Sequence, residues 1–136
     1  VWDRAITSAD PPIVASHFIH RDFHHGNLLW DGTSLGVVDW SAACAGPPEV
    51  DLAHARFNLH LAGHGDLEPA FIAAYRAAAG RGPDPQWDLV DAIDCLPWYD
   101  GPGAIAGWNG LPGAAAPDAR ARVEAFLSRA LAELGE

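Results

Sequence analysis

The sequence predicts one α+β domain, residues 1–136, that is mostly helical and has a small β-hairpin near its N-terminal end. Two β-rich runs flank an Asp-Gly turn signal, and the chain after residue 48 has apolar residues at helical spacing. An apolar content of 49% in 136 residues is enough for one modest hydrophobic core.

The N-terminal part of the chain is expected to be mostly extended. Residues 1–12 are typical of a connector, and residues 14–20 suit a short strand or the end of a helix. The runs Leu28–Trp30 and Leu35–Val38 are separated by Asp31-Gly32, a strong turn signal, and predict a hairpin with a loop longer than the minimum.

Three helices are expected between Pro48 and the Gly/Pro-rich segment that follows. Residues 49–62 begin with acidic residues, which the positive end of a helix dipole favours. In residues 66–79, Asp66 is a candidate N-cap and Gly80 a stop signal. The third helix is predicted over residues 86–99.

A loop is predicted over residues 101–113, where Gly and Pro are crowded, and a last helix after it. Its apolar residues recur at helical spacing: Val123, Phe126, Leu127, Ala130, Leu131 and Leu134. Pro117 suits its first turn, and Arg120, Arg122 and Glu124 are expected to face water.

Composition excludes some classes of function. The net charge is −10 and the chain has no Lys, so a nucleic-acid backbone is a poor partner, whereas a cationic ligand would be attracted. The alternative is that the acidity serves only solubility. No apolar run is long enough to span a membrane, and Cys44 and Cys95 form no metal-type pair, which favours a cytoplasmic protein with reduced thiols.

Three oxygen-bearing side chains are spaced so that a hairpin would gather them. Asp22 lies in a loop, Asn27 at the start of the first hairpin strand and Asp39 at the end of the second. Because the two ends of a hairpin are neighbours, Asn27 and Asp39 can converge on one hard cation such as Mg²⁺. A free carboxylate beside that cation suits phosphoryl transfer to a hydroxyl.

The segment also resembles a known family. It contains His20, Asp22, His24, Gly26 and Asn27, then Val38-Asp39-Trp40, then Gly46, Pro48 and Asp51-Leu52-Ala53. In this order and spacing, these residues resemble the aminoglycoside phosphotransferase and choline kinase group, which has a protein-kinase-like fold. Two residues differ from the family pattern: Arg21 stands where Gly is usual, and Pro47 where Asp is usual.

The resemblance implies a role for each matched residue. Asp22 would be the catalytic base, and Asn27 and Asp39 the Mg²⁺ ligands. His20, His24 and Asp51 would support the catalytic loop. The domain would then be the C-terminal, catalytic and substrate-binding lobe of an ATP-dependent small-molecule kinase, with an aminoglycoside-like antibiotic or a similar hydroxyl compound as substrate.

The sequence before the motif has no room for a nucleotide-binding lobe, and the chain lacks the Lys that such a lobe uses. We therefore expect a fragment or a truncated product that is inactive alone and self-associates through the surface that the lobe would cover. The alternative function is a non-catalytic module that binds a ligand or a partner chain.

Other residues have a functional and a structural interpretation. Four histidines, His17, His20, His24 and His25, suggest a zinc site. Their spacing instead favours packing and hydrogen bonding within the loop. The histidines His54, His60 and His64 are expected to be ordinary surface or core residues. The residues Trp98, Tyr99, Asp100 and Trp108 either form an acceptor pocket for a cationic or sugar substrate or only pack.

Overall fold

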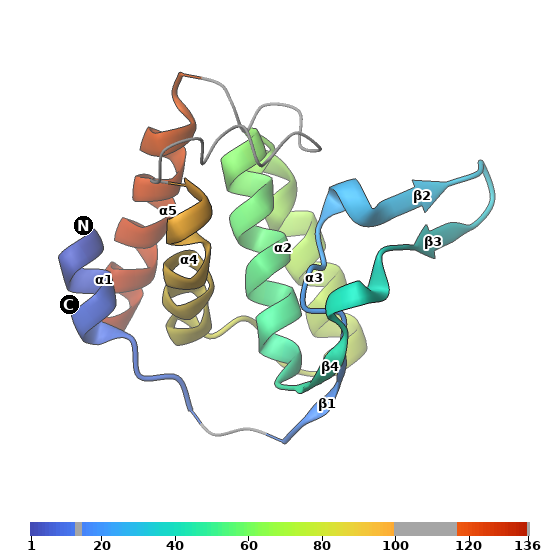
Figure 1. The fold of residues 1–136 in the computed structure, drawn as a ribbon, viewed down its shortest axis with the longest axis horizontal. Helices are drawn as coiled ribbons and strands as arrows, with labels where there is room; N and C mark the ends of the chain where they lie inside the picture. Colours follow the sequence, from blue (N-terminus) through green and yellow to red (C-terminus); the bar gives the residue numbers. More distant parts are fainter. Residues whose placement is uncertain (13–14, 100–116, 136) are drawn as a thin grey trace.

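The computed structural model describes residues 1–12, 15–99 and 117–135 (Figure 1). Within these ranges the chain is mostly helical, with two antiparallel sheets of two strands each. The prediction of a mostly helical α+β fold is confirmed.

The strands form two separate pairs. β2 (Leu28–Trp30) pairs with β3 (Leu35–Val37), which is the predicted hairpin. Its turn is closed by Asp31, whose Oδ1 accepts the N–H groups of Thr33 and Ser34 at 2.8 and 2.7 Å.

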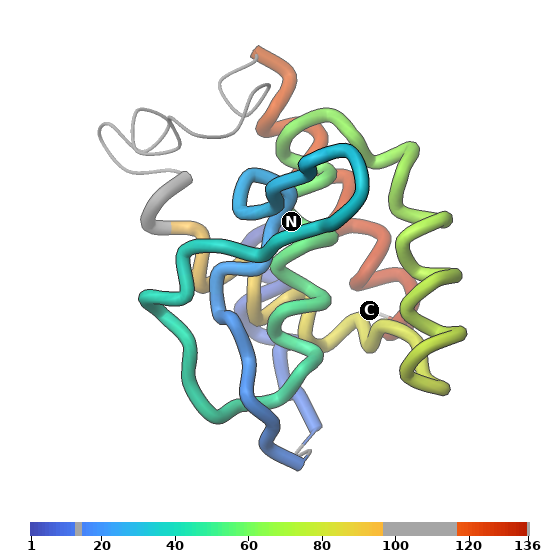
Figure 2. The backbone as a smooth tube through the Cα atoms, turned by 90° about the vertical axis from the view of Figure 1, so that its right-hand side faces the viewer, coloured from blue at the N-terminus to red at the C-terminus, as the bar shows by residue number. Residues whose placement is uncertain are grey.

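The second pair of strands joins distant parts of the chain. β1 (His17–Ile19) runs antiparallel to β4 (Cys44–Gly46), and Figure 2 shows the two segments side by side below α2. β4 is not predictable from the sequence, because the residues Cys-Ala-Gly have no β-rich pattern and the strand forms only by pairing with β1.

The four predicted helices are present as α2 (Pro48–Ala62), α3 (Glu68–Ala79), α4 (Pro85–Tyr99) and α5 (Ala119–Leu134). Gly80 ends α3 with a left-handed φ of 70°, as predicted. The N-cap assigned to Asp66 was wrong: Asp66 lies in a 3-10 turn, Gly65–Leu67, and α3 begins after it.

A further helix, α1 (Trp2–Ser8), corrects the expectation that residues 1–12 form only a connector. Ala5 on α1 is fully buried and belongs to the same core cluster as Leu89 of α4 and Leu127 of α5. This short segment becomes helical because it packs on two neighbouring helices, which is a tertiary effect that local sequence does not reveal.

The core lies between α2, α4 and α5, with α1 on one side and the strands on the other (Figure 1). α2 is central and is buried on most of its surface, so it buries polar residues as well as Leu52, Phe57 and Leu61. Buried polar groups need partners, and His54 and Arg56 of α2 find theirs in the loop before β2, at the start of α3 and on α4.

Arg122 was expected to face water but instead joins α5 to the end of α2. Its guanidinium donates to the carbonyl oxygens of His60 and Leu61 at 3.0 and 2.6 Å.

Pro117 lies in a turn just before α5 and not in its first turn. The predicted loop at 101–113 lies outside the described residues. None of the helices in the described ranges combines the length and apolar character that crossing a bilayer requires.

Candidate active site

The loop that carries Asp22 is fixed to the first turn of α2 by Asp51. The two carboxylate oxygens of Asp51 accept the backbone N–H groups of His20 and Arg21, each at 2.7 Å. Arg21 has a φ of 72°, a left-handed conformation that costs a non-glycine residue about 1–2 kcal/mol. The Asp51 contacts hold the backbone in this turn immediately before Asp22.

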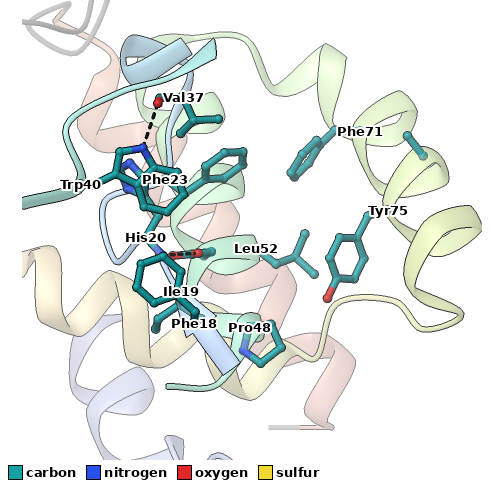
Figure 3. Close-up of a pocket in the computed structure, with 12 residues that line it drawn as sticks. Phe18, Ile19, His20, Phe23, Val37, Trp40, Pro48, Leu52, Phe71 and Tyr75 are labelled. Carbon is teal, nitrogen blue, oxygen red and sulfur yellow. Dashed lines mark hydrogen bonds between the residues drawn. The ribbon is translucent and has the colours of Figure 1, made fainter. Parts of the chain in front are cut away.

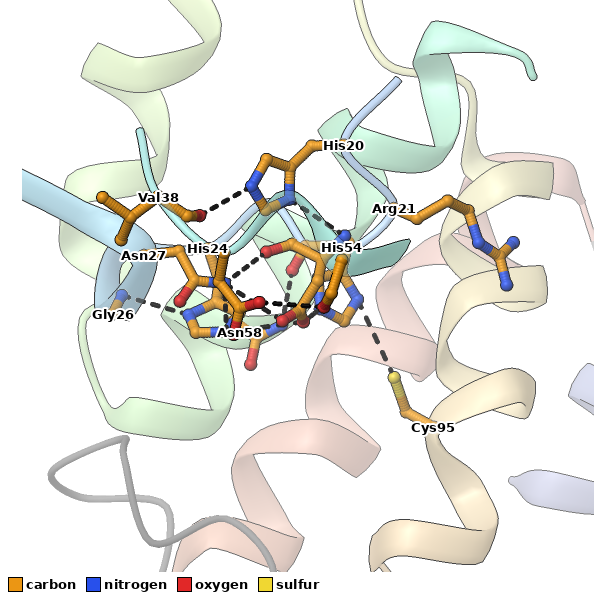
Figure 4. Close-up of polar contacts among 12 residues, drawn as sticks. His20, Arg21, His24, Gly26, Asn27, Val38, His54, Asn58 and Cys95 are labelled. Atoms are coloured by element: carbon orange, nitrogen blue, oxygen red, sulfur yellow. Dashed lines mark hydrogen bonds and ion pairs between the residues drawn. The ribbon is translucent and has the colours of Figure 1, made fainter. Parts of the chain in front are cut away.

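His20 joins the loop to the end of the hairpin (Figure 4). Its side chain is buried, its Nδ1 accepts the N–H of Asp22 at 3.3 Å, and its Nε2 lies 2.8 Å from the carbonyl oxygen of Val38. Since Nδ1 accepts, the ring proton lies on Nε2 and is donated to Val38. Both ring nitrogens are used for hydrogen bonds that hold the loop.

Asp22 and Asn27 are in direct contact. The Asn27 Nδ2 donates to Asp22 Oδ2 at 3.0 Å and to the Asp22 carbonyl oxygen at 2.9 Å. These bonds fix the orientation of the Asn27 amide, and no group among the described residues donates to its Oδ1. The Asp22 side chain is 43% exposed, so it can also reach a ligand from solvent.

Asp39 lies at the same end of the hairpin as Asn27. The Val38 N–H donates to the Asn27 carbonyl oxygen at 3.0 Å, which brings the two chain segments together. Asp39 is exposed, has a left-handed φ of 61°, and accepts the Ser41 hydroxyl at 2.8 Å on one carboxylate oxygen. Its other oxygen and Asn27 Oδ1 are hard oxygen donors of the kind that Mg²⁺ binds.

His24 supports Asp22 from within the loop. Its Nδ1 accepts the Gly26 N–H at 3.0 Å, and its Nε2 lies 3.4 Å from Asp22 Oδ1. Burial lowers the pKa of His24, so the ring is neutral at pH 7 and Nε2 carries the proton that faces Asp22. A zinc site built from the loop histidines is not supported, because the only group of convergent metal-binding atoms found among the described residues lies elsewhere.

His54 on α2 is the site residue that sequence reasoning missed. Its Nε2 lies 3.2 Å from Asp22 Oδ1, and its Nδ1 lies 2.9 Å from Oδ1 of the buried Asp91 on α4. Burial opposes a charge on His54, but the two carboxylates outweigh it and raise the pKa of His54 well above its usual range. In turn, the hydrogen bond from His54 lowers the pKa of Asp22 despite partial burial.

Cys95 completes a buried cluster with His54 and Asp91, and Figure 4 shows His54 between the loop and Cys95. The potential ligand atoms of the three residues lie within 4.8 Å of one another. Burial raises the pKa of the Cys95 thiol to about 11. Cys95 Sγ lies 3.9 Å from His54 Nδ1 and 3.9 Å from Asp91 Oδ2, so the three residues form a hydrogen-bonded cluster.

Two patterns in the sequence could have identified His54 and Asp91. His54 follows Asp51 by three residues, so the two lie on one face of α2 and both reach the loop. Asp88, Asp91 and Cys95 are likewise spaced on one face of α4, and all three are buried. Acidic residues on the buried face of a helix indicate partners on the neighbouring helix.

An apolar cavity of about 410 Å³ lies beside the loop, on the side of His20 and Asp51 (Figure 3). Its walls include Phe18, Trp40, Phe71 and Tyr75.

The sequence predicts four possible substrate contacts, Trp98, Tyr99, Asp100 and Trp108. Trp98 and Tyr99 are the last residues of α4, and Asp100 and Trp108 lie outside the described residues.

The sequence model of the phosphotransferase enzyme family matches residues 1–93. This range includes the loop, the hairpin, α2, α3 and the part of α4 that carries Asp91. The chain therefore belongs to the phosphotransferase enzyme family. No curated protein and no solved structure gave a match.

Proposed function

We propose that this chain is the catalytic lobe of a kinase-like phosphotransferase that transfers a phosphoryl group from ATP to a hydroxyl of a small molecule. The observation that carries the proposal is that Asn27 Nδ2 donates both to the carboxylate oxygen Oδ2 and to the backbone carbonyl oxygen of Asp22. It places an oriented amide oxygen next to a partly exposed carboxylate, which is the arrangement that a metal ligand beside a base requires.

In this proposal Asn27 Oδ1 and Asp39 hold Mg²⁺, which would neutralise charge on the phosphates of ATP when bound. Asp22 orients the acceptor hydroxyl and takes its proton. The hydroxyl oxygen forms a bond to the γ-phosphorus, and the bond from that phosphorus to the β-phosphate oxygen breaks, so that ADP leaves with the electron pair. His20, His24 and Asp51 hold the loop, and a nucleotide-binding lobe supplies the remaining ATP contacts.

The test uses the full-length protein that contains this chain and γ-labelled ATP. A thermal-shift screen of aminoglycosides, macrolides, choline-like amines and sugars first selects an acceptor. We expect Asp22→Asn to lower kcat about 10²–10⁴-fold with a small change in KM for ATP. Asp66→Asn, an exposed acid in the turn before α3, is the matched control and should leave kcat unchanged. Normal turnover of Asp22→Asn would refute the assignment of the base.

The surface around the strands supports two further parts of the proposal. Phe18, Leu29, Trp30, Leu35 and Trp40 are large apolar residues with exposed fractions between 47% and 74%. We propose that a nucleotide-binding lobe covers this surface and that residues 1–136 alone are inactive and self-associate through it. A clean monomer in sedimentation at high concentration would contradict the self-association.

The alternative is a non-catalytic module that binds a ligand, for which the apolar cavity beside the loop offers space. Ligand binding in the thermal-shift screen without phosphoryl transfer by the full-length protein would favour this alternative.

A further inference from the structure

His54 lies between two carboxylates that come from different parts of the fold. Asp22, from the loop, faces Nε2 at 3.2 Å, and Asp91, from α4, faces Nδ1 at 2.9 Å. His54 and Asp91 are 9% and 7% exposed, so water contributes little to the contact between them, whereas the Asp22 side chain on the other side of the ring is 43% exposed. The imidazole is thus the direct link between the partly exposed Asp22 and the helical core.

This geometry determines the charge of the ring. An ionised carboxylate only accepts hydrogen bonds, and a neutral imidazole has one N–H, so a neutral ring would turn a lone pair toward one of the two carboxylates. Only the imidazolium donates to both. The other ionisable groups that face His54 are neutral: His24 in the loop, whose ring centroid is 5.9 Å away, has a lowered pKa, and Cys95 on α4 has a raised one.

We propose that His54 is a positioning residue for Asp22, and that Asp91 holds His54 as the imidazolium that fixes the Asp22 carboxylate in place. This inference rests on the proposed function, in which Asp22 is the base. It assigns a role to two residues outside the loop motif, one on α2 and one on α4.

The proposed role is one of positioning, because an imidazolium has no lone pair and cannot accept the proton of the acceptor hydroxyl. His54 and His24 hold Asp22 Oδ1, and Asn27 holds Oδ2 from one side. A carboxylate oxygen has two acceptor positions, so Oδ2 keeps one for the acceptor hydroxyl. A shift of about 1 Å in the position of a reacting group can change the reaction rate by about 100-fold, so holding Asp22 in place affects the rate.

The first experiment reads the charge of His54 without any assay of activity. The full-length protein is labelled with ¹⁵N-histidine, and the ring nitrogens are followed by NMR from pH 5 to pH 9, with His54→Gln used to assign the signal. We expect both His54 nitrogens to stay protonated at pH 8 while exposed histidines titrate normally. A His54 ring that is neutral at pH 7 would overturn the inference.

The second experiment measures MgATP hydrolysis by the full-length protein, with water as the acceptor, so that no other substrate is needed. Asp91→Asn keeps an oxygen acceptor for Nδ1 but removes the charge that favours the imidazolium. We expect this variant to lower kcat about 10-fold or more, with KM for MgATP changed less than about 2-fold. In NMR, His54 of Asp91→Asn should lose its proton from one nitrogen below pH 8.

A double-mutant cycle separates positioning from a general loss of structure. If Asp91 acts through His54, then Asp91→Asn in the His54→Gln background should lower kcat by less than about 2-fold relative to His54→Gln alone. The matched control is Asp88→Asn, which removes another buried α4 carboxylate that contacts α2 through Arg56 and not through His54. This control should leave kcat per folded molecule unchanged, with the folded fraction measured by circular dichroism.

The outcomes distinguish this inference from the proposed function. If Asp22→Asn abolishes hydrolysis while Asp91→Asn and His54→Gln retain full kcat, the positioning role is refuted and the proposed function stands. If Asp22→Asn retains full hydrolysis, the proposed function fails and this inference fails with it. Equal losses in Asp88→Asn and Asp91→Asn would also refute the inference, since the effect would then be structural. The wild-type NMR measurement decides the charge of His54 even if a variant does not fold.

Discussion

Arg21 occupies a left-handed backbone conformation, and its N–H donates a 2.7 Å hydrogen bond to Asp51 Oδ1. The bond joins a strained position in the loop to the first turn of a buried helix. Because His20 donates its own N–H to the other oxygen of Asp51, one carboxylate holds two consecutive peptide groups. The conformation of the loop before Asp22 therefore depends on a residue thirty positions away in the chain.

Replacing Asp51 by Ala should lower stability by about 2–4 kcal/mol, because two backbone donors lose a charged acceptor in a partly buried site. Urea unfolding of wild type and variant measures the difference. Asp66→Ala, which removes an exposed acid near the start of α3, is the control and should change stability by less than about 0.5 kcal/mol. A similar small change for Asp51→Ala would show that the loop does not depend on this contact.

Position 21 should prefer glycine over alanine. Both variants remove the Arg side chain, but only glycine adopts a φ of 72° without steric cost. We expect Arg21→Gly to be more stable than Arg21→Ala by about 1 kcal/mol in urea unfolding. Equal stability of the two variants would mean that the loop relaxes out of the left-handed conformation.

The sequence predicted the elements that local pattern defines. The hairpin around Asp31-Gly32 and the four helices after Pro47 form as expected, since turn residues and helical periodicity act over a few positions. Asn27 lies five positions after Asp22, so the contact between these two residues is also a short-range one. The roles of these residues in catalysis stay predictions.

Features that depend on packing between distant segments were missed. α1 is helical because Ala5 is buried in the common core, and β4 is a strand because it pairs with β1. The pairing of His54 with Asp91 joins two helices, so the spacing of each residue within its own helix does not identify its partner. For the same reason Arg122 was assigned to the solvent-facing side of α5, although it bonds the end of α2.

Arg122→Ala should lower stability by about 2 kcal/mol, because the carbonyl oxygens of His60 and Leu61 lose a charged donor at the C-terminal end of α2. Arg120→Ala is the control on the same helix, since Arg120 is more exposed and pairs with Glu124 at i+4. That change should cost about 0.5 kcal/mol or less. Thermal unfolding of both variants checks the difference, and equal effects would contradict the structural role of Arg122.

Asp88 on α4 is a buried acid with incomplete hydrogen bonding. Its Oδ2 accepts from Arg56, whereas its Oδ1 is buried without a partner among the described residues. Burial raises the pKa of Asp88 to about 7 from an ordinary value of 3.8, against the opposing effect of Arg56. Glu68 shares Arg56 but also contacts His60 and Arg129, and these partners outweigh its burial and lower its pKa to about 2.

The two acids predict opposite pH dependences of stability. The folded state binds a proton at Asp88 more tightly than the unfolded state, so this contribution is complete below pH 3.8 and is lost as the pH rises through about 7. The contribution of Glu68 is present above pH 4.5 and is lost as the pH falls toward about 2. Stability from this pair of residues should therefore be greatest between about pH 4 and 5.

Asp88→Asn should remove the loss of stability above pH 5, because an amide does not ionise when the pH rises. The free energy of unfolding in urea is compared at pH 5 and pH 8 for wild type and Asp88→Asn. Wild type should lose about 2–3 kcal/mol more than the variant over this range. His54 also favours folding less as the pH rises, but it is present in both proteins, so its effect cancels in the comparison. Parallel changes in wild type and variant would mean that Arg56 keeps Asp88 ionised throughout and that the unpaired Oδ1 imposes no pH-dependent cost.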